Sequence, residues 1–135
     1  MRQFLVPLLS AILMLAGYQA GASEEGQAAK PPSIYVSMHP HFLTNLADGK
    51  HFVQIKAQAM VANEETESAL QLHMPAVRHE LLMLLGDMQA ADLKGVKQKQ
   101  QFLEHAVEVM RDVLTERQAA AADVEGMFIT SMVIQ

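Results

Sequence analysis

Two histidines separated by a proline are the residues of this sequence best suited to chemistry. His39 and His41 flank Pro40, and in an extended segment residues two apart point to the same side. The two imidazoles could therefore hold a metal ion jointly, but a zinc site needs three or four converging ligands and the sequence offers no clear third one. A structural or surface role is favoured. The alternative is an exported binding module or metal-dependent hydrolase that uses His39 and His41.

Other motifs of catalysis or cofactor binding are missing from the sequence. Without cysteine, disulfides, thiolate nucleophiles and sulfur-ligated metal sites are excluded. Neither a Gly-x-Ser-x-Gly motif nor a glycine-rich phosphate loop occurs. The 10 methionines are scattered, which favours core packing over copper binding, and His73, His79 and His105 fall among glutamates of expected helices. We therefore expect no catalytic, cofactor-binding or metal-binding residues, no cofactor and no enzymatic activity.

The composition fits one small domain that does not bind nucleic acid. The chain has 135 residues, half of them hydrophobic, and a formal net charge of −5. Arg2 is the only charged residue before Glu24, so the chain without its first 22 residues carries −5 − 1 = −6. Such an acidic balance lacks the basic patch that nucleic-acid binding requires.

The sequence predicts a β-hairpin in the first part of the expected domain. Strand-like runs from Phe42 to Leu46 and from His51 to Val61 flank Asp48-Gly49, a strong turn signal between strands. In the second run apolar and mostly polar residues alternate, as in a strand with one buried and one solvated face. The residues expected on the buried face are Val53, Ile55, Ala57, Ala59 and Val61.

Helical periodicity follows the hairpin. Asn63 is placed to cap a helix, and Pro75 either kinks that helix or starts a second one that ends at Gly86. After a turn around residues 92–95, a long amphipathic helix begins near Lys97. Its apolar stripe consists of Phe102, Leu103, Ala106, Val107, Met110, Val113 and Leu114.

The last residues, 127–135, are apolar and β-branched, which predicts a buried strand. The order of elements is therefore hairpin, helices, strand. This order predicts an α+β fold, in which an antiparallel sheet has helices packed on one face.

The N-terminal stretch predicts export. Residues 4–17 are apolar apart from Ser10, yet the run is shorter than the roughly 20 residues that span a bilayer. The small residues Ala20-Gly21-Ala22 follow it, as before a signal-peptidase cut. We interpret residues 1–22 as a signal peptide or a short N-terminal membrane anchor, residues 23–33 as a linker with Pro31-Pro32, and residues 34–135 as a folded periplasmic domain.

Several landmarks, in their order along the chain, resemble those of the flagellar basal body-associated FliL family. They are Tyr35, Thr44-Asn45-Leu46, the long alternating strand from His51, Pro75-Ala76-Val77-Arg78 at the start of an apolar helix, Asp92-Leu93, the helix from Lys97, and Phe128-Ile129-Thr130 with Val133-Ile134-Gln135 at the end. No one landmark is specific; their shared order over about a hundred residues is much more so.

This resemblance implies a fold, a location and partners. FliL-like proteins have one N-terminal span and a periplasmic domain of stomatin-like (SPFH-type) fold. They assemble into rings and associate with the stator units of the flagellar motor. The resemblance therefore implies a non-enzymatic accessory that binds stator units of the MotA/MotB type and the basal body. It also implies self-association into a ring, a place on the periplasmic side of the inner membrane, and support of flagellar rotation, swimming or swarming.

Overall fold

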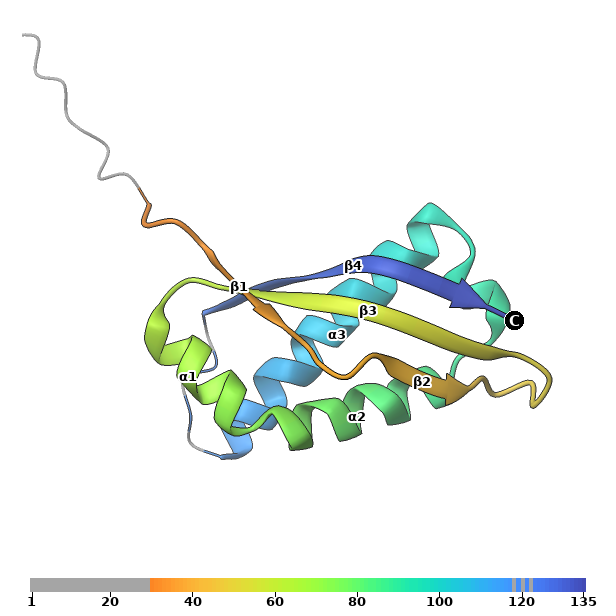
Figure 1. Cartoon of the computed structure of the whole chain (residues 1–135), viewed down its shortest axis with the longest axis horizontal. Helices are drawn as coiled ribbons and strands as arrows, with labels where there is room; N and C mark the ends of the chain where they lie inside the picture. Colours follow the sequence, from red (N-terminus) through yellow and green to blue (C-terminus); the bar gives the residue numbers. More distant parts are fainter. Residues whose placement is uncertain (1–29, 118, 120, 122) are drawn as a thin grey trace, which may run out of the picture.

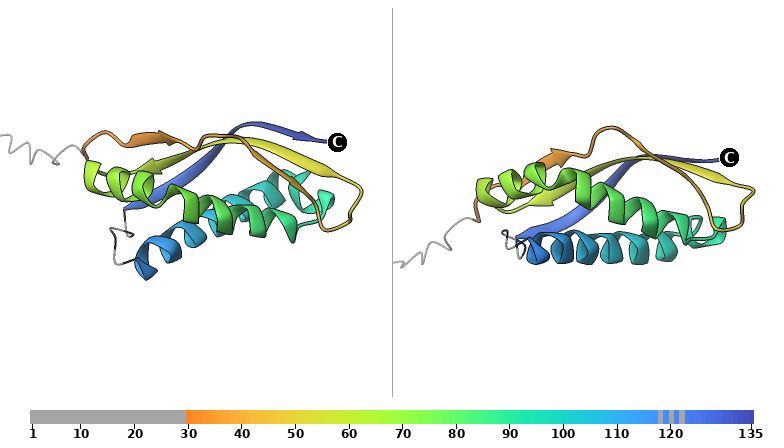
Figure 2. Two further views of the ribbon diagram at one scale, coloured as in Figure 1. Left: turned by 60° about the horizontal axis from the view of Figure 1, so that its bottom comes forward. Right: turned by 90° about the horizontal axis from the view of Figure 1, so that it is seen from below.

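The computed structural model describes residues 30–117, 119, 121 and 123–135. These residues form an antiparallel sheet with helices against one of its faces (Figure 1, Figure 2). The predicted α+β class, with an antiparallel sheet and helices, is therefore confirmed. The signal peptide or anchor expected in residues 1–22 and the first part of the expected linker, residues 23–29, lie outside the described residues.

The sheet is built around strand β3 (Phe52–Val61). Strands β1 (Ile34–Ser37) and β2 (Phe42–Asn45) share one edge of β3, with β1 opposite its second half and β2 opposite its first half. Strand β4 (Val124–Ile134) pairs with the other edge of β3 along its length, and every pairing is antiparallel. Within the described part of the chain, β4 has β3 as its only strand neighbour.

Strands β2 and β3 form the predicted hairpin. Gly49 in the connecting turn has a φ of 67°, a left-handed conformation that glycine adopts without steric cost. At the base of the turn the Leu46 N–H donates to the His51 carbonyl oxygen at 2.8 Å. The predicted apolar face of β3 is buried against the helices, and its members are Val53, Ile55, Ala57, Ala59 and Val61.

Two helices follow β3 instead of one kinked helix. Helix α1 (Glu64–Leu72) is capped as predicted, because the Asn63 side-chain oxygen accepts a hydrogen bond from the Thr66 N–H at 2.8 Å. Helix α2 (Met74–Gly86) carries Pro75 in its first turn, where the missing N–H of proline leaves no helical hydrogen bond unmade. The second of the two alternatives for Pro75 is therefore correct.

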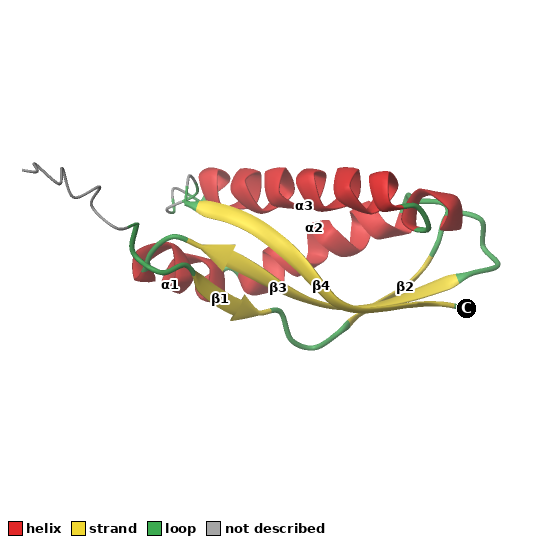
Figure 3. Cartoon of the chain, turned by 90° about the horizontal axis from the view of Figure 1, so that it is seen from above, coloured by secondary structure: helices red, strands yellow, loops and turns green. Residues whose placement is uncertain are grey.

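Helix α3 (Val96–Glu116) lies next to α2 and along β4 (Figure 3). A short 3-10 helix, η1 (Ala90–Leu93), precedes it where the sequence predicts only a turn. The core lies between the sheet and the helices. Its largest fully buried side chains include Phe42, Met38, Ile55, Leu70, Leu81, Leu85, Leu93, Met110 and Leu114.

The last strand differs from the predicted one in two respects. It begins at Val124 instead of Met127, and these two are the only residues of β4 that are buried. The expectation of a buried strand is wrong because the helices cover only one face of the sheet. The outward side chains of β4, such as Phe128 and Val133, therefore lie on the face that the helices leave uncovered.

Candidate functional site

The two candidate metal ligands lie in the loop between β1 and β2. The ring centroids of His39 and His41 are 6.3 Å apart. His39 is exposed, whereas His41 is half-buried and its Nδ1 lies 3.3 Å from the amide nitrogen of Gln54 on β3. The sequence therefore predicted correctly that the two imidazoles lie near each other, but the segment that carries them bends at Pro40 instead of being extended.

Arg78 of α2 binds the backbone of the same loop. Its guanidinium donates hydrogen bonds to the carbonyl oxygens of Met38 and His41, each at 3.4 Å, and of Pro40, and it lies 4.5 Å from the centre of the Phe42 ring. Burial lowers the pKa of Arg78, but a guanidinium stays protonated at neutral pH. Its positive charge on the backbone of this loop opposes the binding of a cation by the loop.

The structure gives no support to the metal-dependent alternative. Within the described ranges, no group of three or more histidine, aspartate or glutamate side chains is placed to hold a metal ion. His79 and His105 are exposed on α2 and α3, and His73 is half-buried where α1 meets α2. None of these three belongs to the loop that carries His39 and His41.

A further polar pair, in the hairpin turn, was not anticipated from the sequence. The carboxylate of Asp48 accepts hydrogen bonds from the N–H groups of Lys50 and His51, both at 2.9 Å, and lies 2.7 Å from His51 Nδ1. These contacts, with the two backbone N–H groups first, lower the pKa of Asp48 to about 2. The pair stabilises the turn. The sequence signal that could have predicted it is an aspartate at the start of a tight turn.

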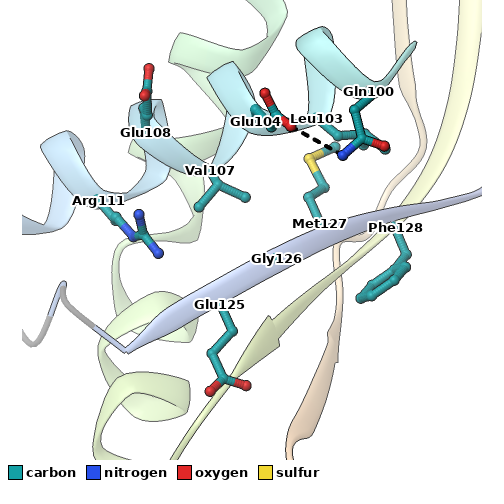
Figure 4. A pocket seen from close by; sticks show the side chains of 10 residues that line it. All are labelled: Gln100, Leu103, Glu104, Val107, Glu108, Arg111, Glu125, Gly126, Met127 and Phe128. Atoms are coloured by element: carbon teal, nitrogen blue, oxygen red, sulfur yellow. Dashed lines mark hydrogen bonds between the residues drawn. The ribbon is translucent and has the colours of Figure 1, made fainter. Parts of the chain in front are cut away.

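An open groove of about 540 Å³ lies between α3 and β4 (Figure 4). The side chains of α3 that line it include apolar ones, Leu103 and Val107, and charged ones, Glu104, Glu108 and Arg111. In Figure 4 the Met127 side chain points from β4 toward α3, and Phe128 points the other way. An open groove beside a sheet edge suits the binding of an extended protein segment better than catalysis on a small substrate.

Aromatic side chains lie on the uncovered face of the sheet as well. The rings of Tyr35 on β1 and Phe128 on β4 have centroids 5.8 Å apart, so they meet across β3. Gly126 lies beside Phe128, and a Cβ at this position would be in ordinary van der Waals contact with the Met60 methyl carbon at 3.5 Å and the Phe128 ring at 3.7 Å. Tyr35 and Phe128 remain 57% and 44% exposed, which leaves an apolar patch open to a partner.

The comparison with known protein families decides the assignment. The model of the family described as flagellar basal body-associated protein FliL matches residues 35–135. These are 101 of the 135 residues, and they contain nearly the whole sheet and all the helices described above. The chain belongs to the FliL family. The resemblance inferred from the order of landmarks is thereby confirmed, whereas a search of the curated proteins gives no match.

In this FliL-family domain the segment before β1 is bound to the start of β4. The Ser33 hydroxyl donates to the Glu125 carboxylate at 2.9 Å, and the Lys30 ammonium forms an ion pair with the same carboxylate. The contact with Lys30, followed by that with Ser33, holds the pKa of Glu125 below its usual range. The preceding chain therefore joins the FliL-family domain where β1 and β4 lie on either side of β3 (Figure 1).

The helices described for this FliL-family domain are α1, α2, η1 and α3. None of those helices has both the length and the hydropathy of a transmembrane segment.

Proposed function

We propose that this protein is a non-enzymatic accessory of the bacterial flagellar basal body that associates with stator units of the MotA/MotB type. In this role it supports flagellar rotation and hence swimming or swarming. The observation that carries the proposal is the extent of the family match, which covers the folded domain from β1 to the end of β4. The surfaces of that domain, rather than a reactive centre, then make the functional contacts.

The proposed location is the periplasmic side of the inner membrane. Residues 1–22 would hold the protein there as a single anchor, or release it into the periplasm if they are cleaved as a signal peptide. The contacts of Lys30 and Ser33 with Glu125 support a defined attachment point. Gln135 lies at the opposite end of the long axis of the domain, away from Lys30 (Figure 1). With an anchor before residue 30, the C-terminal end of the sheet would face away from the membrane.

We also propose that copies of the domain associate into a ring around or beside the stator. Head-to-tail contacts between two different surfaces of identical copies close into a ring when the rotation between copies permits it. The domain has different surfaces on its two sides, an uncovered sheet face with Tyr35 and Phe128 and a layer of helices. This asymmetry supports a head-to-tail arrangement.

Motility of a deletion strain tests the proposed role. Loss of the gene should reduce spreading on soft agar, and a tagged full-length chain should restore motility and co-purify with the stator from membranes. The double variant His39→Ala/His41→Ala should restore motility as well, because no reaction depends on these imidazoles. A chain without residues 127–135 should fail, because this deletion removes most of the strand that pairs with β3.

Two outcomes would contradict the proposal. Normal motility of the deletion strain, together with no stator recovered by the tagged chain, would reject the flagellar role. Loss of motility in the double histidine variant, with its circular dichroism spectrum and unfolding transition unchanged, would favour the metal-dependent alternative instead.

A further inference from the structure

The hydrogen-bond ladder of the sheet defines which backbone groups of β4 point away from β3. Phe52 and Gln135 exchange both of their backbone hydrogen bonds, at 2.8 and 3.0 Å, and the Ala62 N–H donates to the Asp123 carbonyl oxygen at 2.9 Å. In an antiparallel pair the residues that bond to the partner alternate with residues that do not. The even-numbered residues of β3 therefore direct their backbone groups toward β4.

Gln58 and Met60 are such residues, and their partners on β4 are Phe128 and Gly126. The N–H and C=O groups of Met127 and Ile129 then point outward, away from the sheet. At Val124 the carbonyl oxygen accepts from Arg111 Nε and Nη2, at 3.0 and 2.6 Å. No hydrogen bond among the described residues occupies the outward groups of Met127 and Ile129 in this way.

The segment of β4 from Gly126 to Ile129 lacks the features that usually prevent an edge strand from pairing with another chain. Natural edge strands are protected by charged side chains, proline or bulges. Glu125 is the only charged residue of β4, and the strand contains no proline. Its register shifts lie opposite Lys56/Ala57 and Met60/Val61, so the segment from Gly126 to Ile129 pairs regularly with β3. That segment is able to accept a further strand.

The groove beside this segment is lined by both apolar and charged side chains. A strand placed along the outer edge of β4 would direct every second side chain toward α3, where Leu103 and Val107 offer apolar surface. Glu104, Glu108 and Arg111 line the groove as well. The guanidinium of Arg111 is bound to the Val124 carbonyl oxygen, and neither glutamate forms an ion pair with another described residue. A lysine or arginine suits this position best, because its stem packs on the apolar side chains while its charge meets the carboxylates.

We propose that the outer edge of β4, from Gly126 to Ile129, binds an extended segment of a partner protein in which basic residues alternate with apolar ones. The basic side chains enter the groove toward Glu104 and Glu108. The apolar side chains lie on the uncovered sheet face next to Phe128. The partner backbone bonds to the outward groups of Met127 and Ile129. This site does not depend on the flagellar role, because it is defined by the edge and the charges alone.

Binding of a labelled peptide tests the site directly. The probe is fluorescein-labelled Thr-Lys-Val-Lys-Val-Lys-Thr, and its fluorescence anisotropy is measured with the full-length chain in a non-ionic detergent. The peptide should bind, and its counterpart with glutamate in place of each lysine should bind at least ~10-fold more weakly because the groove carries carboxylates. Added salt should weaken the binding. No binding of the lysine peptide, or equal binding of the two peptides, would overturn the proposal.

Charge reversal in the groove gives a second test. The variant Glu104→Lys/Glu108→Lys should reduce affinity for the lysine peptide by about 10-fold or more and increase affinity for the glutamate peptide. The matched control Glu80→Lys/Asp87→Lys changes the net charge equally at exposed positions of α2 and its C-terminal cap, which do not line the groove. Equal effects of the two variants would show nonspecific attraction and contradict the site.

N-methylation of the peptide separates backbone pairing from simple charge attraction. Methyl groups on one alternate set of residues should abolish binding, and methyl groups on the other set should leave it nearly unchanged, because only one edge of the peptide bonds to β4. Equal effects of both sets would contradict strand addition. A monomer–dimer equilibrium that the groove variant changes, without any peptide binding, would assign the edge to a second copy of this chain and overturn the proposal.

Discussion

At the scale of single residues, polar side chains in this domain fix backbone segments. Arg78 binds three carbonyl oxygens of the loop between β1 and β2, and Arg111 binds the carbonyl oxygen of Val124. Asn63 caps α1 through its oxygen, and its amide donates to Asp123 at 2.8 Å. Each of these contacts joins parts of the chain that hydrophobic packing alone would hold less precisely.

Asp48 gives a pH-dependent prediction at this scale. Its pKa in the folded protein is about 2, below the ordinary value of 3.8. A depressed pKa means that the carboxylate stabilises the fold fully above pH 3.8 and that this contribution is lost as the pH falls toward 2. Asp48→Asn should therefore lower the Tm at neutral pH, and the difference from wild type should disappear near the acid end of this window.

Thermal unfolding followed by circular dichroism measures that difference. Asp87→Asn is the control, because Asp87 is exposed and its side chain accepts no hydrogen bond from the described residues. A Tm difference for Asp48→Asn that stays constant down to about pH 2 would show that the charge of Asp48 does not stabilise the turn.

At the scale of elements, β3 is the strand on which the fold depends. Ile55 is fully buried on its inner face, and Gln54 is half-buried on its outer face. Ile55→Asp should destabilise the domain by about 3–5 kcal/mol, because it buries a carboxylate without a partner. Gln54→Asp should cost less than about 1 kcal/mol. Urea denaturation of both variants checks this, and equal losses would mean that the register of β3 is wrong.

Elements with strong local signals were predictable from the sequence. The alternation in β3 and the Asp-Gly turn predicted the hairpin, and Asn63 and Gly86 marked helix ends correctly. Strand β1 was not predicted, because four residues between two proline-containing segments carry little periodicity and β1 is defined by its distant pairing with β3. The exposure of β4 was missed because an apolar strand sequence does not show whether one or both faces of its sheet are covered.

The candidate sites show the same difference between local features, which could be predicted, and features that depend on distant contacts, which could not. The proximity of His39 and His41 could be predicted, because the two residues are only two positions apart, although the segment bends at Pro40 instead of being extended. The contact of Arg78 with their loop could not, since it joins residues about 40 positions apart. The groove between α3 and β4 could not be predicted either, because it depends on how a helix and a strand pack against each other.

At the scale of the whole molecule, the structure combines one covered and one uncovered face of a small sheet. The helices lie against one face (Figure 2). The other face carries the Tyr35–Phe128 patch. The N-terminal segment joins the domain beside Glu125, and the chain ends at the far end of the sheet (Figure 1). A domain with an uncovered sheet face that carries exposed aromatic side chains is suited to contacts with neighbouring proteins.

The position of the protein in the cell tests the central claim, a role at the flagellar basal body, most directly. A fusion of the full-length chain to mCherry, through a flexible linker after Gln135, is imaged together with a labelled basal-body protein. Membership in the FliL family predicts that the fusion forms foci that coincide with the basal bodies. A signal spread evenly around the cell envelope, from a fusion that is intact and restores motility, would contradict that role.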